Sequence, residues 1–250
     1  MSDDLVVLLI LAVRLGVPLL IPRFPLPAIL TCLVVDAADQ TILQNHTDLP
    51  LDNYQGYDKA LDIYYLSVAY LSTFRNWTDG FAQRTAAFLW YYRLVGVVAF
   101  ELIEARWLLL VFPNTFEYVF IAYEAVRLRW DPARLGHRQV VGLTAFIWIV
   151  IKLPQEWWIH VAQNDFTDFL KGDVLGVPLD AAWGEALGEN LWFVALLVAV
   201  GVGAVVGWHR LRARLPEPDW RTTVAVDRHL PPFGGLTPAR VPLWSARTGE

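Results

Sequence analysis

Hydrophobic residues fall into long runs that are separated by short polar segments. Several runs approach 20 residues, the length of an α-helix that crosses a hydrocarbon core of about 30 Å. We predict seven membrane spans, at residues 5–21, 26–43, 59–74, 85–106, 115–126, 139–162 and 191–208. The pattern therefore predicts an all-α, polytopic transmembrane helix bundle. The fifth run is short for a full crossing, and a hairpin or re-entrant break at Pro113-Asn114 would change the span count.

The composition agrees with a membrane protein. Of the 250 residues, 56% are hydrophobic and 18% are charged, whereas soluble domains carry about 25% charged residues. The lipid bilayer is the expected partner, and nothing indicates a nucleic acid. The single cysteine, Cys32, excludes an intrachain disulfide and a zinc site built from several cysteines. The sequence points to no particular cofactor.

The distribution of charge predicts the orientation. Basic residues in short loops mark the cytoplasmic side of a membrane protein. They occupy alternate connections here, at Arg23, Arg75, Arg84, Arg127, Arg129, Arg134, Arg138, Arg210, Arg212 and Arg214, while the other connections are rich in Asp and Glu. We therefore expect the N-terminus outside and the C-terminus in the cytoplasm, in a multi-pass protein of the cell membrane (the cytoplasmic membrane, if the source is a bacterium).

We divide the chain into a transmembrane bundle, residues 1–209, and a largely irregular cytoplasmic tail, residues 210–250, which contains many prolines. The tail either packs on the inner face of the bundle or binds a protein partner. The last span carries the GxxxG pair Gly203 and Gly207, which permits close approach of another helix. Packing within the chain is the default expectation for this pair, and a helix of another subunit is the alternative.

Ionisable side chains inside the predicted spans are the candidate functional residues, because each costs about 2.5–3.5 kcal/mol at the centre of a membrane helix. Their spacing places them in stripes. Lys152, Glu156 and His160 share one helix face, beside a kink expected at Pro154. The other candidates are Arg14, Asp36, Asp39, Asp62, Arg93, Glu101 and Glu104, and the fifth span adds Glu117 and Glu124.

Combined with the predicted orientation, these stripes suggest a funnel that opens to the outside. The acidic residues and His160 fall in its outer half, whereas Arg14, Arg93 and Lys152 fall near mid-depth and would form its floor. We expect this cavity to serve a transporter of a small solute or cation.

Three alternatives remain open. The charges could form a structural network of ion pairs. The protein could be a membrane-embedded enzyme acting at the outer leaflet, with His160 and Glu156 as an acid–base pair or as metal ligands. It could also be a non-catalytic subunit of a membrane complex.

Overall fold

The computed structural model describes residues 3–47 and 54–226, and all regular structure in these ranges is helical. The first half comprises α1 (Asp3–Gly16), η1 (Val17–Leu20), α2 (Pro25–His46), α3 (Tyr54–Asn76), α4 (Gly80–Ile103), α5 (Trp107–Val111) and α6 (Thr115–Arg127). The second half comprises η2 (Pro132–Arg134), α7 (His137–Phe146), η3 (Ile147–Lys152), α8 (Leu153–Glu156), η4 (Trp157–Val161), α9 (Phe166–Asp168), η5 (Phe169–Leu175), α10 (Trp183–Glu189) and α11 (Leu191–Arg212).

Three helices in the described part of the chain are long and apolar enough to cross a membrane. They are Gly80–Ile103, His137–Val161 and Leu191–Arg212. The second is made of α7, η3, α8 and η4, and its α-helical geometry is interrupted by the π-helical stretches η3 and η4. The prediction of an all-helical chain with membrane-spanning segments is confirmed at this level.

Helix α6 lies at the centre of the bundle. Eight of its 13 residues are buried, among them Phe116 and Phe120. The Trp77 ring stacks on Tyr123 with ring centroids 3.8 Å apart. Helices α2, α3, α4 and α7 all pack against α6. The shortest predicted span is therefore surrounded by other helices and is largely buried.

The chain reaches α6 through a break that Pro113 and Asn114 create. Helix α4 ends at Ile103, the next residue Glu104 has a left-handed backbone (φ 56°), and α5 then runs back beside α4. A Cβ on Gly96 would lie 2.1 Å from Cβ of Phe112, so the two segments approach this closely only because residue 96 is glycine. Helix α6 (Thr115–Arg127) covers the predicted run 115–126, and the short α5 precedes it.

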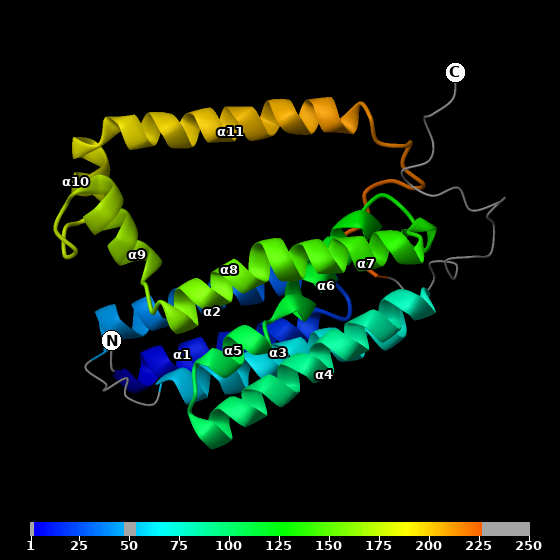
Figure 1. Cartoon of the computed structure of the whole chain (residues 1–250), viewed down its shortest axis with the longest axis horizontal. Helices are drawn as coiled ribbons and strands as arrows, with labels where there is room; N and C mark the ends of the chain where they lie inside the picture. The colour runs from blue at the N-terminus through cyan, green and yellow to red at the C-terminus, as the bar shows by residue number, and fades with distance from the viewer. Residues whose placement is uncertain (1–2, 48–53, 227–250) are drawn as a thin grey trace.

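Successive helices run alternately between the two ends of the bundle (Figure 1). At one end, the Asn76 amide donates to the carbonyl of Pro22 over 3.2 Å, and the Phe81 ring stacks on His137. At the other end, Val6 and Ile10 of α1 pack against Leu43 of α2. We call these the Pro22 end and the Leu43 end.

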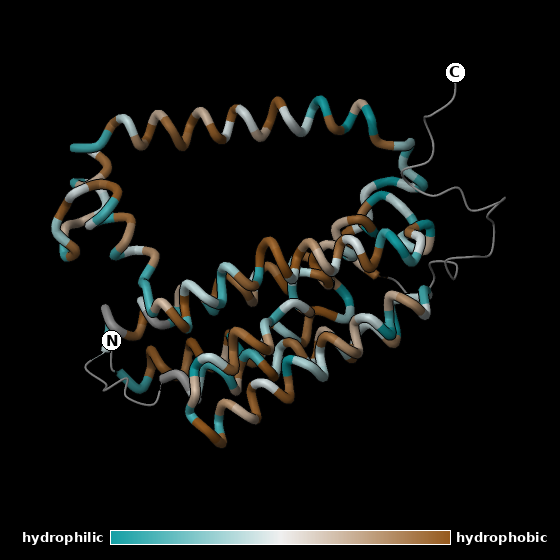
Figure 2. Tube along the Cα trace, in the orientation of Figure 1, coloured by the Kyte–Doolittle hydropathy of each residue, from teal (hydrophilic) through white to brown (hydrophobic). Residues whose placement is uncertain are grey.

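Helix α11 lies alongside the bundle but apart from it (Figure 1), and most of its residues are hydrophobic or near neutral in hydropathy (Figure 2). Within the described ranges it packs against α10, and none of its residues is buried. A Cβ on Gly203 or Gly207 would meet nothing within 4 Å. The expected packing of this GxxxG pair within the chain is therefore wrong for the described residues.

The helix continues to Arg212, three residues beyond the predicted bundle boundary at 209. After it, the chain returns to the Pro22 end, where Val226 N donates to the carbonyl of Arg23 over 2.7 Å. The described part of the tail is irregular and packs on the bundle. The rest of the predicted tail, 227–250, lies outside the described residues.

Candidate functional site

Arg14 is the centre of a buried cluster of charges. It lies in the last turn of α1, where a cation interacts favourably with the helix dipole. Its guanidinium donates to four aspartates, at 2.5 Å to Asp36, 3.1 Å to Asp58, 3.2 Å to Asp62 and at short range to Asp39. The side chains of Arg14 and Asp39 are 3% and 0% exposed, so water does not screen this contact.

Lys59 is the second base of the Arg14 cluster. Its ammonium lies 2.8 Å from Asp58 and 3.4 Å from Asp62. Two bases thus face four carboxylates, which leaves a formal charge of about −2 if every group is ionised. Carboxylate oxygens of Asp36, Asp58 and Asp62 lie within 4.8 Å of one another. Because an uncompensated buried charge is costly, this arrangement favours bound protons or a bound cation.

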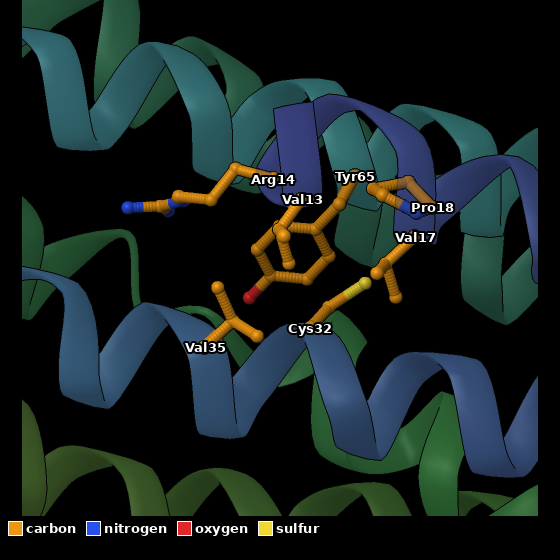
Figure 3. Close-up of a pocket in the computed structure, with 7 residues that line it drawn as sticks. All are labelled: Val13, Arg14, Val17, Pro18, Cys32, Val35 and Tyr65. Carbon is orange, nitrogen blue, oxygen red and sulfur yellow. The ribbon is translucent and has the colours of Figure 1, made fainter. Parts of the chain in front are cut away.

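A small pocket opens beside Arg14, between α1, α2 and α3. Val13, Val17, Cys32 and Val35 line it together with the ring of Tyr65, which points between the helices (Figure 3). It has room for about one water molecule. The pocket is mostly apolar and is too small for an organic solute.

A second buried cluster surrounds Glu156. One carboxylate oxygen accepts a hydrogen bond from Asn114 N over 3.1 Å, and the other lies 3.1 Å from Nε2 of His160. The ammonium of Lys152 is 3.7 Å from the carboxylate and lies over the ring of Tyr118. Glu156 thus caps the N-terminus of α6, where a negative charge is stabilised.

Two interrupted helices meet at this Glu156 cluster. Helix α6 starts there after the break at Pro113, and the helix 137–161 is π-helical over Ile147–Lys152 and Trp157–Val161, on both sides of Pro154. Such π-helical turns are frequent at functional sites. In transporters, binding sites near mid-membrane are typically formed by interrupted helices.

Tyr65, which lines the pocket beside Arg14, and Glu117 extend the Glu156 cluster toward the Arg14 cluster. The Tyr65 hydroxyl donates to Glu117 over 2.5 Å, and the other oxygen of Glu117 accepts from the Asn114 side chain over 3.1 Å. Arg93 donates to the carbonyl of Phe112 over 3.0 Å and interacts electrostatically with Glu117 and Glu156. Buried polar groups therefore extend from α1 to the helix 137–161.

Several buried polar atoms in this network have no hydrogen-bond partner among the described residues. They are Nδ1 of His160, Oδ1 of Asn114, Oγ1 of Thr115 and Nε of Arg93. Buried polar groups are normally satisfied, so orphaned ones need an unseen water, ion or ligand. Nε2 of His160 is directed at Glu156, which leaves Nδ1 as the ring nitrogen that a ligand could contact.

A third cluster lies near the Pro22 end. The Glu124 carboxylate accepts from the Trp77 indole over 2.8 Å and from Nε of Arg127 over 2.6 Å. Its side chain is fully buried. The ion pair lies within α6, and the hydrogen bond from Trp77, the residue after α3, holds this end of α6 to the α3–α4 connection.

The structure brings together most of the predicted site residues, namely Arg14, Asp36, Asp39, Asp62, Arg93, Lys152, Glu156 and His160. Glu101 and Glu104 do not belong to the buried network and are exposed, because α4 extends beyond the bundle before it ends. The predicted layout of the funnel also differs. Arg14 lies among the acids rather than on a floor beneath them, and side chains that pair with one another fill the space.

Sequence reasoning missed four members of the network, Asp58, Lys59, Tyr65 and Asn114. Asp58 lies four residues before Asp62 on α3, and this spacing could have added it to the stripe. Tyr65 and Asn114 carry no comparable signal, because single polar residues of these types are common near membrane interfaces. The predicted pair Glu156 and His160 is adjacent, but the three-carboxylate group that could hold a metal lies at Asp36, Asp58 and Asp62.

Comparisons with family models, with curated proteins and with solved structures found no match to this chain.

Proposed function

We propose that the chain is a multi-pass protein of the cell membrane that transports a small cation or solute through its buried charged network. In this proposal the chain crosses the membrane seven times, with the N-terminus outside and the C-terminus in the cytoplasm. The alternating direction of successive helices is compatible with this topology. This orientation gathers the basic connections at the Pro22 end, as the positive-inside rule requires.

The observation that carries the proposal is the Arg14 cluster. Four carboxylates converge on one arginine and one lysine inside a membrane-embedded bundle, so the site needs additional positive charge. Protons or a small metal cation supply that charge from the outside. The interrupted helices at Glu156 provide elements that can rearrange as the charge moves.

Asp39→Asn is expected to reduce cation flux at least tenfold in proteoliposomes, because Asp39 is the fully buried acid of the cluster. Proton flux is followed with a pH-sensitive dye, and Na⁺ and K⁺ uptake are measured in parallel. Asp168→Asn, an exposed change of the same chemistry, should leave the flux unchanged. Equal flux in wild type and Asp39→Asn, or no flux of any of these ions in the wild type, would refute the proposal.

The isolation of α11 favours a second candidate, a subunit of a membrane complex. This helix is the most apolar candidate span and has no buried residue. If a partner helix covers it, Gly203→Leu should break a stable co-purified complex, whereas Asp39→Asn should not. A monodisperse monomer in a mild detergent would exclude this candidate.

A further inference from the structure

The tail forms an ordered connection across the Pro22 end. We call residues 215–226 the strap. The strap accepts three hydrogen bonds from the bundle: Trp130 Nε1 to Pro216 O (3.2 Å), Asp131 N to Asp219 Oδ2 (2.7 Å) and Arg134 to Asp219 Oδ1 (2.8 Å). It donates four: Asp219 N to Arg129 O (2.9 Å), Trp220 Nε1 to Arg127 O (3.1 Å), Thr223 N to Leu128 O (2.9 Å) and Val226 N to Arg23 O (2.7 Å). Most of these bonds use backbone atoms, so the path of the chain itself is fixed.

The strap joins elements that lie far apart in the sequence. It binds the segment after α6, then η2, and then the connection between η1 and α2 at Arg23. The Trp220 indole reaches the carbonyl of Arg127, whose side chain holds the buried Glu124. The strap thus binds the backbone of a residue that belongs to the buried Glu124–Arg127 pair of α6.

Asp219 is the most reversible anchor of the strap. Its carboxylate accepts hydrogen bonds from the backbone of Asp131 and from the guanidinium of Arg134. The side chain of Asp219 is 29% exposed and that of Arg134 is 15% exposed. The Glu124–Arg127 pair is, in contrast, 0% and 7% exposed. Water can compete for Asp219, so this contact can open and close while the buried pair stays formed.

We propose that the strap is a latch that closes the Pro22 end of the bundle, and that release of Asp219 opens the cytoplasmic exit of the network. The strap bridges the segment after α6 and the connection at Arg23, which are the elements that have to separate for an exit to open at this end. The role of the strap as a gate rests on the proposed transport function, whereas its attachment to the bundle does not.

Amide hydrogen exchange on the full chain in nanodiscs tests the attachment. Asp219→Ala should raise the exchange rate of the Asp219, Thr223 and Val226 amides about tenfold, because they lose their common anchor. Glu217→Ala removes the same charge from an exposed strap residue and should have no such effect. Unchanged exchange in Asp219→Ala would overturn the latch whether or not the protein transports anything.

A reversible cross-link tests the gate. Arg23→Cys and Val226→Cys are combined with Cys32→Ala, so that the introduced pair is the only one that can oxidise. The backbone hydrogen bond between these positions brings them within the range of a disulfide. Oxidation should lower cation flux at least tenfold, and reduction should restore it. Equal flux in both states would overturn the gate, and absence of flux in the reduced protein and the wild type would overturn the transport function with it.

Discussion

Arg14→Met is expected to prevent stable folding of the bundle. The arginine contacts four aspartates, and its removal leaves their charges buried with Lys59 as the remaining base of the cluster. Removing one partner of a buried ion pair typically costs about 3–5 kcal/mol, a large share of the 5–15 kcal/mol that stabilises a typical domain. The yield of monodisperse protein and its thermal unfolding in detergent measure this effect.

Two further variants separate charge from packing at Arg14. Arg84→Met removes an exposed arginine and should leave the unfolding temperature within about one degree of wild type, because exposed ion pairs contribute little. Arg14→Met combined with Asp39→Asn should recover part of the loss, since one buried charge is removed with its partner. Wild-type stability of the single Arg14→Met variant would show that the cluster does not need its arginine.

Gly96→Leu is expected to have the next largest effect. Even the first side-chain atom would lie 2.1 Å from Cβ and 2.6 Å from Cγ of Phe112. Phe112 cannot move freely, because its amide donates to Leu108 O and its carbonyl accepts from Arg93. Overpacking of this kind costs about 1–3 kcal/mol or more. It should displace the break at Pro113 and lower the unfolding temperature by several degrees.

Glycine-to-alanine changes provide the matched comparison. Gly96→Ala should also destabilise, although alanine favours a helix over glycine by about 1 kcal/mol, because the clash exceeds that gain. Gly142→Ala meets no atom within 4 Å and should be neutral or slightly stabilising. Phe112→Ala should not rescue Gly96→Ala, because alanine keeps the Cβ that would lie 2.1 Å from the new side chain. A Gly96→Ala protein more stable than wild type would contradict the close approach of α5 to α4.

The candidate network explains why this chain places so many charges in helices that are otherwise apolar. Hydrogen bonds join Tyr65, Glu117, Asn114 and Glu156 into one buried chain, and Tyr65 lines a small pocket together with Arg14. The strap then lies at the Pro22 end, beyond the Glu124–Arg127 pair. Under the proposed function, the buried charged groups bind the cation and the strap controls its release.

The sequence alone determined the helical class and much of the site. Apolar runs of membrane length indicate helices because the backbone must satisfy its own hydrogen bonds in lipid. The spacing of Lys152, Glu156 and His160 placed them on one face, and the structure brings all three into one buried cluster. These features depend on local periodicity, which can be read from the spacing of residues along the sequence.

Tertiary structure decided what local periodicity cannot encode. Helix rotation and length left Glu101 and Glu104 exposed while Arg93, on the same helix, became buried. The reach of the Arg14 side chain placed it among four aspartates from two other helices. The isolation of α11 and the return of the strap to Arg23 depend on contacts between residues far apart in the chain. Such contacts are set by how whole helices pack, and the pattern of apolar residues along one helix does not specify its partners.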